Sequence, residues 1–137
     1  MKTFAIVMLA AGSLLAQAPV KWEHDLATAQ LRARSEKKPI FIDLWAEWCP
    51  PCQHLQKNVF PSPEAQRALK NYIPLSIMTQ YKNRQSIPEN MKLAERFRLE
   101  AFPTLVVLDA DGKEVRRQEG AFRTGQDLAA WLDGKKE

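Results

Sequence analysis

Residues 40–52 read IFIDLWAEWCPPC, an apolar run that ends in two cysteines separated by two prolines. A short and nearly continuous apolar run is typical of a central strand that is buried on both faces of a parallel or mixed sheet. Asp43 lies inside this run, where a carboxylate is costly unless it is neutral or paired. From Cys49 onward the pattern is helical, with Leu55 and Val59 on one side. The cysteine pair is therefore predicted at a junction between a strand and a helix.

The rest of the chain alternates between helical and extended patterns. Helix starts are indicated by Ser62-Pro63-Glu64 and by Thr124 with Asp127, and Pro74 indicates that its strand lies in part at an edge or bulge. Turn residues 109–112 predict a hairpin. The predicted helices cover residues 23–37, 49–59, 63–69, 89–97 and 124–132, and the predicted strands cover residues 40–45, 72–78, 104–108 and 113–118. This alternation predicts a layered α/β domain with helices on both faces of one sheet.

Composition and charge place few limits on partners. The chain has 137 residues, enough for one domain with a real core, and a formal net charge of +4. Its basic residues are scattered, and no basic stripe interleaved with aromatic residues indicates a nucleic-acid surface. We therefore expect no nucleic-acid partner.

The first residues have the layout of a secretory signal peptide. Lys2 precedes an apolar run over residues 4–15, and the sequence Ala-Gln-Ala follows at residues 16–18. The run is shorter than the roughly 20 residues that a helix needs to span a bilayer. We expect residues 1–18 to be removed on export and residues 19–137 to form a periplasmic or secreted domain. The alternatives are an uncleaved membrane tether and a buried N-terminal helix.

Cys49 and Cys52 are the only cysteines in the chain. Two such thiols tend to form a disulfide in an oxidising compartment. A zinc site needs three or four protein ligands, and the only histidines are His24 and His54. On a helix, His54 points well away from the sulfurs, and a structural staple across so short a loop restricts the unfolded chain little. The spacing favours a redox pair, without a metal or cofactor.

The two cysteines are expected to differ. Cys49 lies at the predicted helix start, where unpaired backbone N–H groups stabilise a thiolate, whereas Cys52 lies one turn further in. We therefore expect an exposed attacking sulfur and a buried resolving sulfur. Pro50 and Pro51 suit the first helical turn, where N–H groups have no helical partner. They leave the N–H of Cys52 as the expected donor to the Cys49 sulfur, but they do not set the direction of the redox reaction.

Several segments, in order between Pro39 and Leu132, resemble the thioredoxin family. Residues 42–49 are similar to the strand that leads into the family's active site, with Pro50-Pro51 in place of the usual Gly-Pro. The other similar segments are the cis-proline segment at Phe102-Pro103-Thr104, the hairpin turn at Asp111-Gly112-Lys113, and the closing strand end and last helix at residues 120–122 and 128–132. This resemblance implies a thioredoxin fold, with a central mixed sheet flanked by helices on both faces.

Within the superfamily, the chain is most similar to exported thioredoxin-like reductases, a group that includes the carboxy-terminal domain of disulfide-bond reductase D. Trp22, Lys38-Pro39 and Val59-Phe60 carry this resemblance.

The resemblance implies a role for each matching residue. Cys49 would be the catalytic nucleophile and Cys52 the resolving thiol. Asp43 would be a buried acid that shuttles the Cys52 proton, with a pKa raised by desolvation. The substrate-binding rim, where an extended partner chain docks, would consist of Trp48, Phe102 and Pro103.

The chain also departs from the family. Thioredoxins often carry a lysine that faces the buried acid, but Leu75 or Ser76 occupies that region here. The segment at residues 79–88 is longer than in compact thioredoxins and is a candidate contact for a specific partner. His54 is either an ordinary exposed residue or one that tunes the thiols.

These features predict an exported thiol–disulfide oxidoreductase, acting as a reductant or an electron relay. Its partners would be thiols and disulfides of exported proteins and an upstream electron donor. We expect a monomer without stable membrane insertion after cleavage. The alternatives are an oxidant that inserts disulfides, and a metal-binding or partner-binding module in which the disulfide is idle.

Overall fold

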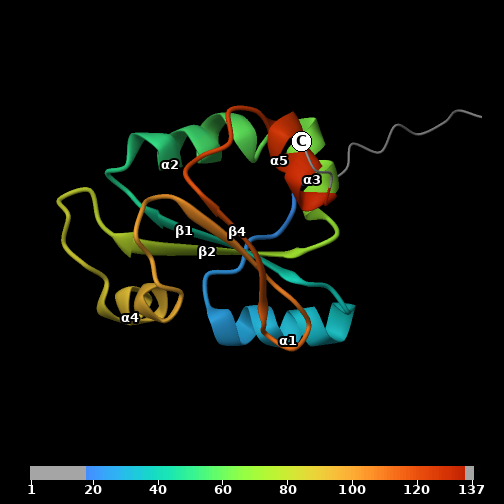
Figure 1. Ribbon diagram of the computed structural model, residues 1–137, viewed down its shortest axis with the longest axis horizontal. Coiled ribbons are helices and arrows are strands. Elements are labelled where there is room, and N and C mark those ends of the chain that lie inside the picture. Colours follow the sequence, from blue (N-terminus) through green and yellow to red (C-terminus); the bar gives the residue numbers. More distant parts are fainter. Residues whose placement is uncertain (1–17, 135–137) are drawn as a thin grey trace, which may run out of the picture.

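The computed structural model describes residues 18–134, which form one mixed four-stranded sheet with helices on both faces (Figure 1). Of the expected signal peptide, only Ala18 lies within the described residues. The strands are β1 (Ile40–Ala46), β2 (Ile73–Gln80), β3 (Thr104–Leu108) and β4 (Glu114–Glu119), in the spatial order β2-β1-β3-β4. The helices are α1 (Leu26–Glu36), α2 (Pro50–His54), the π-helical turn η1 (Leu55–Val59), α3 (Pro63–Leu69), α4 (Pro88–Arg96) and α5 (Gly125–Leu132).

Strand β1 is the central strand, as its apolar run predicts. It pairs in parallel with β2 and antiparallel with β3. Because side chains alternate across a strand, Phe41 packs in the core beneath α3 and α5, whereas Ile40, Ile42 and Leu44 pack on the other face, with residues of α1 and α4. Asp43 shares the face of Phe41. The carboxylate therefore lies in the layer beneath the helix that follows the cysteines.

The start of α1 differs from the prediction. The helix begins at Leu26, because Asp25 caps it by accepting a hydrogen bond from Thr28 N at 2.8 Å. Glu23, predicted within the helix, instead forms a β-bridge with the outer edge of β2. The large apolar side chain of Leu31 is 66% exposed, and the small side chains of Ala29 and Ala33 are the ones that are buried against the sheet.

Strand β2 also differs from the prediction in its length. It continues to Gln80, and a further bridge joins Gln80 to Ser86. The segment at residues 79–88 is therefore not a loop throughout. Residues 81–85, in the middle of this segment, form the turn between the end of β2 and the bridge at Ser86.

Local capping signals correctly predicted the starts of α3 and α5. Ser62 caps α3, with Pro63 in the first turn, and Thr124 and Asp127 form a reciprocal capping box at α5. Gly125 has no Cβ, which allows close contact with Ser62, because a Cβ there would collide with the Ser62 hydroxyl. The start of α5 thus lies against the start of α3.

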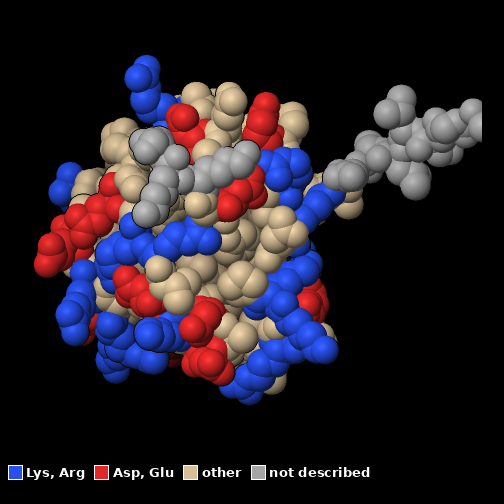
Figure 2. Space-filling view, turned by 45° about the vertical axis from the view of Figure 1, so that its right-hand side comes forward, with Lys and Arg blue, Asp and Glu red and all other residues tan. Residues whose placement is uncertain are grey.

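Among residues 18–134, no helix has the length and apolar character needed to cross a membrane. On the face shown in Figure 2, Lys and Arg side chains lie among Asp and Glu side chains and form no separate region. This face therefore presents charges of both signs.

Candidate active site at the start of α2

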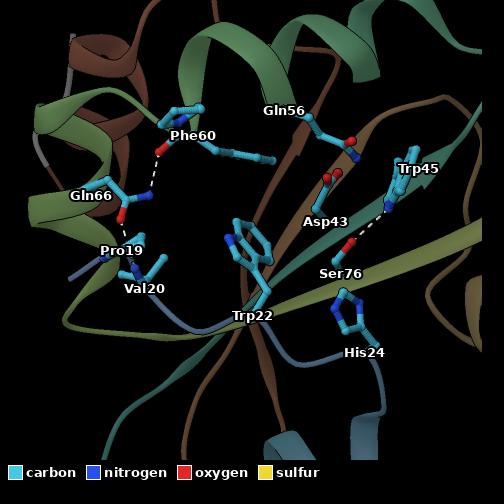
Figure 3. Close-up of a pocket in the computed structure, with 11 residues that line it drawn as sticks. Pro19, Val20, Trp22, His24, Asp43, Trp45, Gln56, Phe60, Gln66 and Ser76 are labelled. Atoms are coloured by element: carbon cyan, nitrogen blue, oxygen red, sulfur yellow. Dashed lines mark hydrogen bonds between the residues drawn. The ribbon is translucent and has the colours of Figure 1, made fainter.

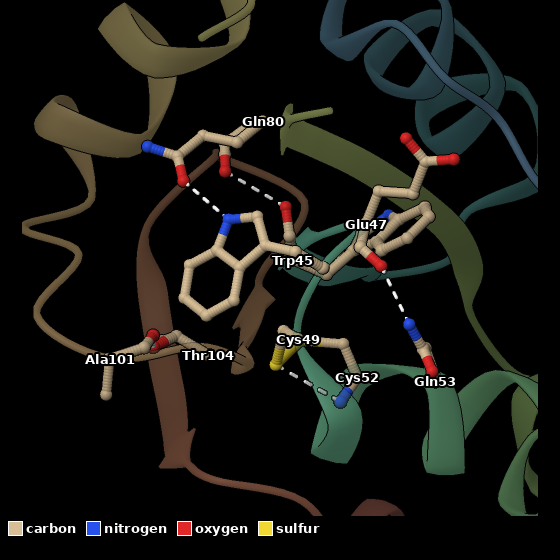
Figure 4. Close-up of a disulfide and its surroundings, with 10 residues drawn as sticks. Trp45, Glu47, Cys49, Cys52, Gln53, Gln80, Ala101 and Thr104 are labelled. Carbon is tan, nitrogen blue, oxygen red and sulfur yellow. Dashed lines mark hydrogen bonds between the residues drawn. A yellow bond between two sulfur atoms is a disulfide. The ribbon is translucent and has the colours of Figure 1, made fainter. Parts of the chain in front are cut away.

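Cys49 and Cys52 form a disulfide at the first turn of α2, with their Cα atoms 5.3 Å apart (Figure 4). Cys49 is the N-cap residue, and its sulfur accepts a hydrogen bond from Cys52 N at 3.3 Å. This is the donor that the sequence predicts, because Pro50 and Pro51 occupy the preceding first-turn positions and have no N–H. A negative charge on the Cys49 sulfur would therefore be stabilised by a backbone donor that is already in place.

The exposure of the two sulfurs differs less than predicted. Cys49 is 3% exposed and Cys52 is fully buried, so the expectation of an exposed attacking sulfur is wrong for this disulfide form. The physical reason is a cover of aromatic rings: Trp45, Trp48 and Phe102 pack against the cysteine pair. The order of exposure still agrees with the expected order.

The three residues predicted for the rim lie together, but not all at the surface. Trp48 and Phe102 are half-buried, and their rings meet edge to face at 5.8 Å. Pro103 follows a cis peptide bond, as predicted, but it is buried. The Thr104 hydroxyl donates to Ala101 O at 2.7 Å and holds the segment that carries Phe102 and Pro103 (Figure 4).

Trp48 is also held from the side of β2. Its indole Nε1 donates to the side-chain oxygen of Gln80 at 2.8 Å. The Arg84 guanidinium lies over the indole ring, 4.2 Å from the ring centroid. The aromatic residue next to Cys49 is thus fixed on one side by Phe102 and on another by the turn that follows β2.

Asp43 is buried and has no partner. It is 1% exposed, and neither carboxylate oxygen accepts a hydrogen bond. This burial raises the pKa of Asp43 to about 8, so the carboxyl group is mostly protonated at neutral pH. The structure contains no hydrogen bond between this acid and either cysteine.

Asp43 lines a cavity of about 640 Å³ (Figure 3). Trp22 and Trp45 lie on either side of the carboxyl group, and the amide of Gln56, which follows the cysteines on η1, lies over it. His24 lines the same cavity and is exposed. The buried acid therefore borders a cavity beneath η1 that the exposed His24 also lines.

Ser76 is the residue of β2 that faces Asp43. The two residues are directly paired in the parallel register, which resolves the choice between Leu75 and Ser76. The Ser76 hydroxyl accepts a hydrogen bond from Trp45 Nε1 at 2.9 Å. No lysine occupies this position, and neutral side chains surround the acid on this side.

His54 contacts the loop before α5. His54 Nε2 is 2.9 Å from Arg123 O and His54 Nδ1 is 3.1 Å from the Asn58 side chain, which links α2 to the loop before α5. His54 is half-buried and so is not the ordinary exposed residue of the first alternative, whereas its role in tuning the thiols stays a prediction. Among residues 18–134, no group of three or more His, Cys, Asp or Glu side chains is placed to hold a metal ion.

The sequence did not indicate Gln80, Arg84 or Gln56 as site residues. Gln80 and Arg84 are far from the cysteines in the chain and reach Trp48 only because β2 lies beside β1. The unusual length of the segment at residues 79–88 was the one available signal. Nothing in the sequence distinguished Gln56 from the other polar residues of its predicted helix.

Comparisons with known proteins agree with this geometry. Among curated proteins, the thiol:disulfide interchange protein DsbD of Haemophilus influenzae is 32% identical over 118 residues, which cover 82% of this chain and 20% of that protein. The chain thus spans a fifth or less of the length of the DsbD relatives that it matches.

Solved structures show the same fold. The oxidoreductase DsbH superposes with a TM-score of 0.70 at 22% identity, covering 92% of this chain and 88% of that chain. The oxidised C-terminal domain of Neisseria meningitidis DsbD superposes with a TM-score of 0.61 at 18% identity, covering 85% of this chain and all of that domain. A family model described as a thioredoxin-like domain matches residues 26–136. The chain belongs to the thioredoxin-like domain family.

Proposed function

We propose that this protein is a thiol–disulfide oxidoreductase that transfers electrons to disulfides of exported proteins, as a reductant or electron relay. The observation that carries this proposal is the Cys49–Cys52 disulfide at the first turn of α2, with Cys52 N–H directed at the Cys49 sulfur. The matching DsbD relatives, named as thiol:disulfide interchange proteins, support the same reaction class.

The reaction begins with the reduced dithiol. The Cys49 thiolate attacks one sulfur of a partner disulfide, which forms a mixed disulfide and releases one partner thiolate. The Cys52 thiolate then attacks the Cys49 sulfur, which releases the second partner thiolate and closes the Cys49–Cys52 disulfide. Two electrons pass to the partner, and each released thiolate takes up a proton.

Asp43 is the proposed acceptor of the Cys52 proton. Its raised pKa of about 8 allows it to exchange protons near neutral pH. Because the carboxyl group has no hydrogen bond to a cysteine, the proton must travel through water. The cavity of about 640 Å³ beside Asp43 has room and polar groups for such water, including Gln56 and Ser76.

Export is the proposed setting of this reaction. The signal-peptide pattern of residues 1–18 supports a periplasmic or secreted protein, and an upstream electron donor must then restore the dithiol after each cycle. The same pattern supports partners among exported proteins, whose cysteines form disulfides in oxidising compartments.

Trapping of partners tests the proposed function. Replacing Cys52 with serine removes the resolving thiol, so Cys52→Ser should accumulate covalent adducts that a reductant releases. Cys49→Ser, the matched control, lacks the attacking thiol and should accumulate far fewer. The measurement is a nonreducing gel of cells carrying each variant, together with insulin reduction by the parent protein. Absence of adducts with Cys52→Ser, and of insulin reduction by the parent, would favour a binding module with an idle disulfide.

A further inference from the structure

The turn at residues 81–85 is a built structure attached to the active site. Its backbone is closed by a hydrogen bond from Arg84 N to Tyr81 O at 2.8 Å and another from Tyr81 N to Gln85 O at 2.9 Å. Lys82 N donates to the Glu47 carboxylate at 2.8 Å, and Glu47 directly precedes Trp48. The turn is therefore fixed relative to the residues that lead into the disulfide.

Arg84 occupies a backbone conformation that arginine rarely adopts. Its φ angle is 68°, in the left-handed region that favours glycine or asparagine. A residue held there costs stability of order 1 kcal/mol or more, which makes the position a candidate for function. In this conformation the Arg84 guanidinium lies 4.2 Å from the centroid of the Trp48 ring.

The contact with Trp48 leaves the N–H groups of the Arg84 guanidinium able to bind a carboxylate. A guanidinium over an aromatic face keeps its N–H groups in its own plane, where they suit a carboxylate in bidentate geometry. Among residues 18–134, no carboxylate forms an ion pair with Arg84, and its side chain is exposed. The segment at residues 79–88 also contains Lys82 and no acidic residue. The site thus presents an unpaired cation beside the tryptophan that precedes Cys49.

We propose that Arg84 is a specificity-determining residue that binds an acidic side chain of the partner, close in sequence to the partner's reacting cysteine. The proposal rests on the thiol–disulfide exchange proposed above. Trp48 and Phe102 frame the disulfide, so a partner segment that brings its sulfur to Cys49 passes along the Trp48 ring. An acidic residue flanking the partner cysteine then meets the guanidinium, while a basic residue there is repelled.

The test compares peptides that differ in one charge. The reduced protein is mixed with short peptides whose single cysteine carries a neutral 2-thiopyridyl disulfide, flanked by glutamate, glutamine or lysine. Attack of Cys49 on the peptide sulfur releases 2-thiopyridone, which is followed by absorbance, and Cys52 then releases the peptide thiol. We expect the glutamate peptide to react about two- to fivefold faster than the glutamine peptide at low ionic strength, the range of an exposed ion pair. The lysine peptide should be slowest, and added salt should reduce the differences.

Three variants separate Arg84 from the general charge of the turn. Arg84→Asn suits the positive φ and should abolish the preference, whereas Arg84→Lys should retain part of it. Lys82→Gln, the matched control, removes the same charge from the same turn and should retain most of the preference. Each peptide rate is divided by the same variant's rate with 2,2′-dithiodipyridine, which has no charged flank and reports any general change in the reactivity of the thiols.

Two outcomes would overturn the role of Arg84. The first is equal rates for the glutamate and glutamine peptides with the parent protein. The second is a preference for the glutamate peptide that does not depend specifically on Arg84, because it persists in Arg84→Asn or is lost equally in Lys82→Gln. In each case, continued reaction with 2,2′-dithiodipyridine would leave the proposed exchange chemistry intact. Failure of that reaction in the reduced parent would instead contradict the proposed function.

Discussion

Asp43 combines burial with the absence of any hydrogen-bond partner. The raised pKa of about 8 means that, between about pH 4 and pH 8, the folded protein holds a proton that the unfolded chain has released. The unfolded state then binds fewer protons than the native state, so stability falls as pH rises through this window. Above about pH 8 the Asp43 carboxyl group is ionised in both states, and the free energy of unfolding no longer falls with pH because of this group.

Asp43→Asn should therefore stabilise the disulfide form increasingly with pH. The gain relative to the parent should grow by roughly 1.4 kcal/mol per pH unit between about pH 4 and pH 8, so that it is about 4 kcal/mol near pH 7, and it should level off above about pH 8. The measurement is urea unfolding of both proteins from pH 5 to pH 9, with the disulfide intact so that no cysteine titrates. A difference in unfolding free energy that does not vary with pH would show that the carboxyl group does not titrate in this range.

Contacts between residues that are close in the chain could be predicted from the sequence, whereas contacts between distant residues could not. The hydrogen bond from Cys52 N to the Cys49 sulfur followed from the sequence, because the prolines leave a single donor within one turn. The burial of Asp43 followed from the apolar run around it. The contact between Arg84 and Trp48 did not, because it depends on two strands that are distant in the chain.

At the scale of elements, the contact between α3 and α5 depends on Gly125. A Cβ at this position would collide with Ser62 Oγ and lie 2.6 Å from Ser62 Cβ and 3.2 Å from Val59 O. Ser62 cannot turn away without loss, because its hydroxyl donates to Val59 O at 2.7 Å and caps α3 by accepting from Ala65 N at 3.3 Å. The start of one helix thus fixes the allowed residue at the start of another.

Gly125→Ala should lower the free energy of unfolding by about 2–4 kcal/mol, from overpacking and a weakened cap. Alanine alone would favour the helix by about 1 kcal/mol, so a loss of stability identifies the collision as the cause. Combining Gly125→Ala with Ser62→Gly, which removes the obstructing side chain, should restore part of the loss. Chemical denaturation of the single and double variants measures both effects, and a single variant as stable as the parent would contradict the contact.

The sequence predicted whether a segment is a helix or a strand more accurately than the residues at which the segment begins and ends. Strand β1, the hairpin of β3 and β4, and the caps of α3 and α5 all have short-range signals, and the structure agrees with each. The predicted start of α1 was wrong because Glu23 is compatible with a helix in isolation, but in the structure its backbone pairs with that of β2. The exposure of Leu31 was also unpredictable, since the approach of α1 to the sheet is set by Ala29 and Ala33.

For the whole molecule, the segment before α1 belongs to the folded domain. Trp22 packs against Phe60 and Phe41, with ring centroids 4.9 Å and 6.1 Å apart. Glu23 pairs with β2 and forms an ion pair with Arg32 at 3.0 Å. These contacts connect the N-terminal segment to the core and to α1.

Trp22→Ala should lower the free energy of unfolding by about 2–4 kcal/mol, because it removes a large aromatic side chain from the edge of the core. Lys21→Ala, its exposed neighbour, is the matched control and should change stability by less than about 0.5 kcal/mol. Thermal and urea unfolding of both variants would measure the difference. Similar stability for Trp22→Ala and the parent would mean that the segment before α1 merely lies on the surface.

The bridge at Glu23 has a consequence for the behaviour of the protein in concentrated solution. An unpaired strand edge is a template on which a strand of another molecule can add, the first step of aggregation. Here Glu23 occupies the free edge of β2, through Glu23 N to Pro74 O and Ser76 N to Glu23 O, each at 2.8 Å. At the opposite edge, β4 carries Arg116 and Arg117 between two glutamates, and such charges oppose the close approach of a second strand. Neither edge of the sheet is thus a ready template for fibre growth.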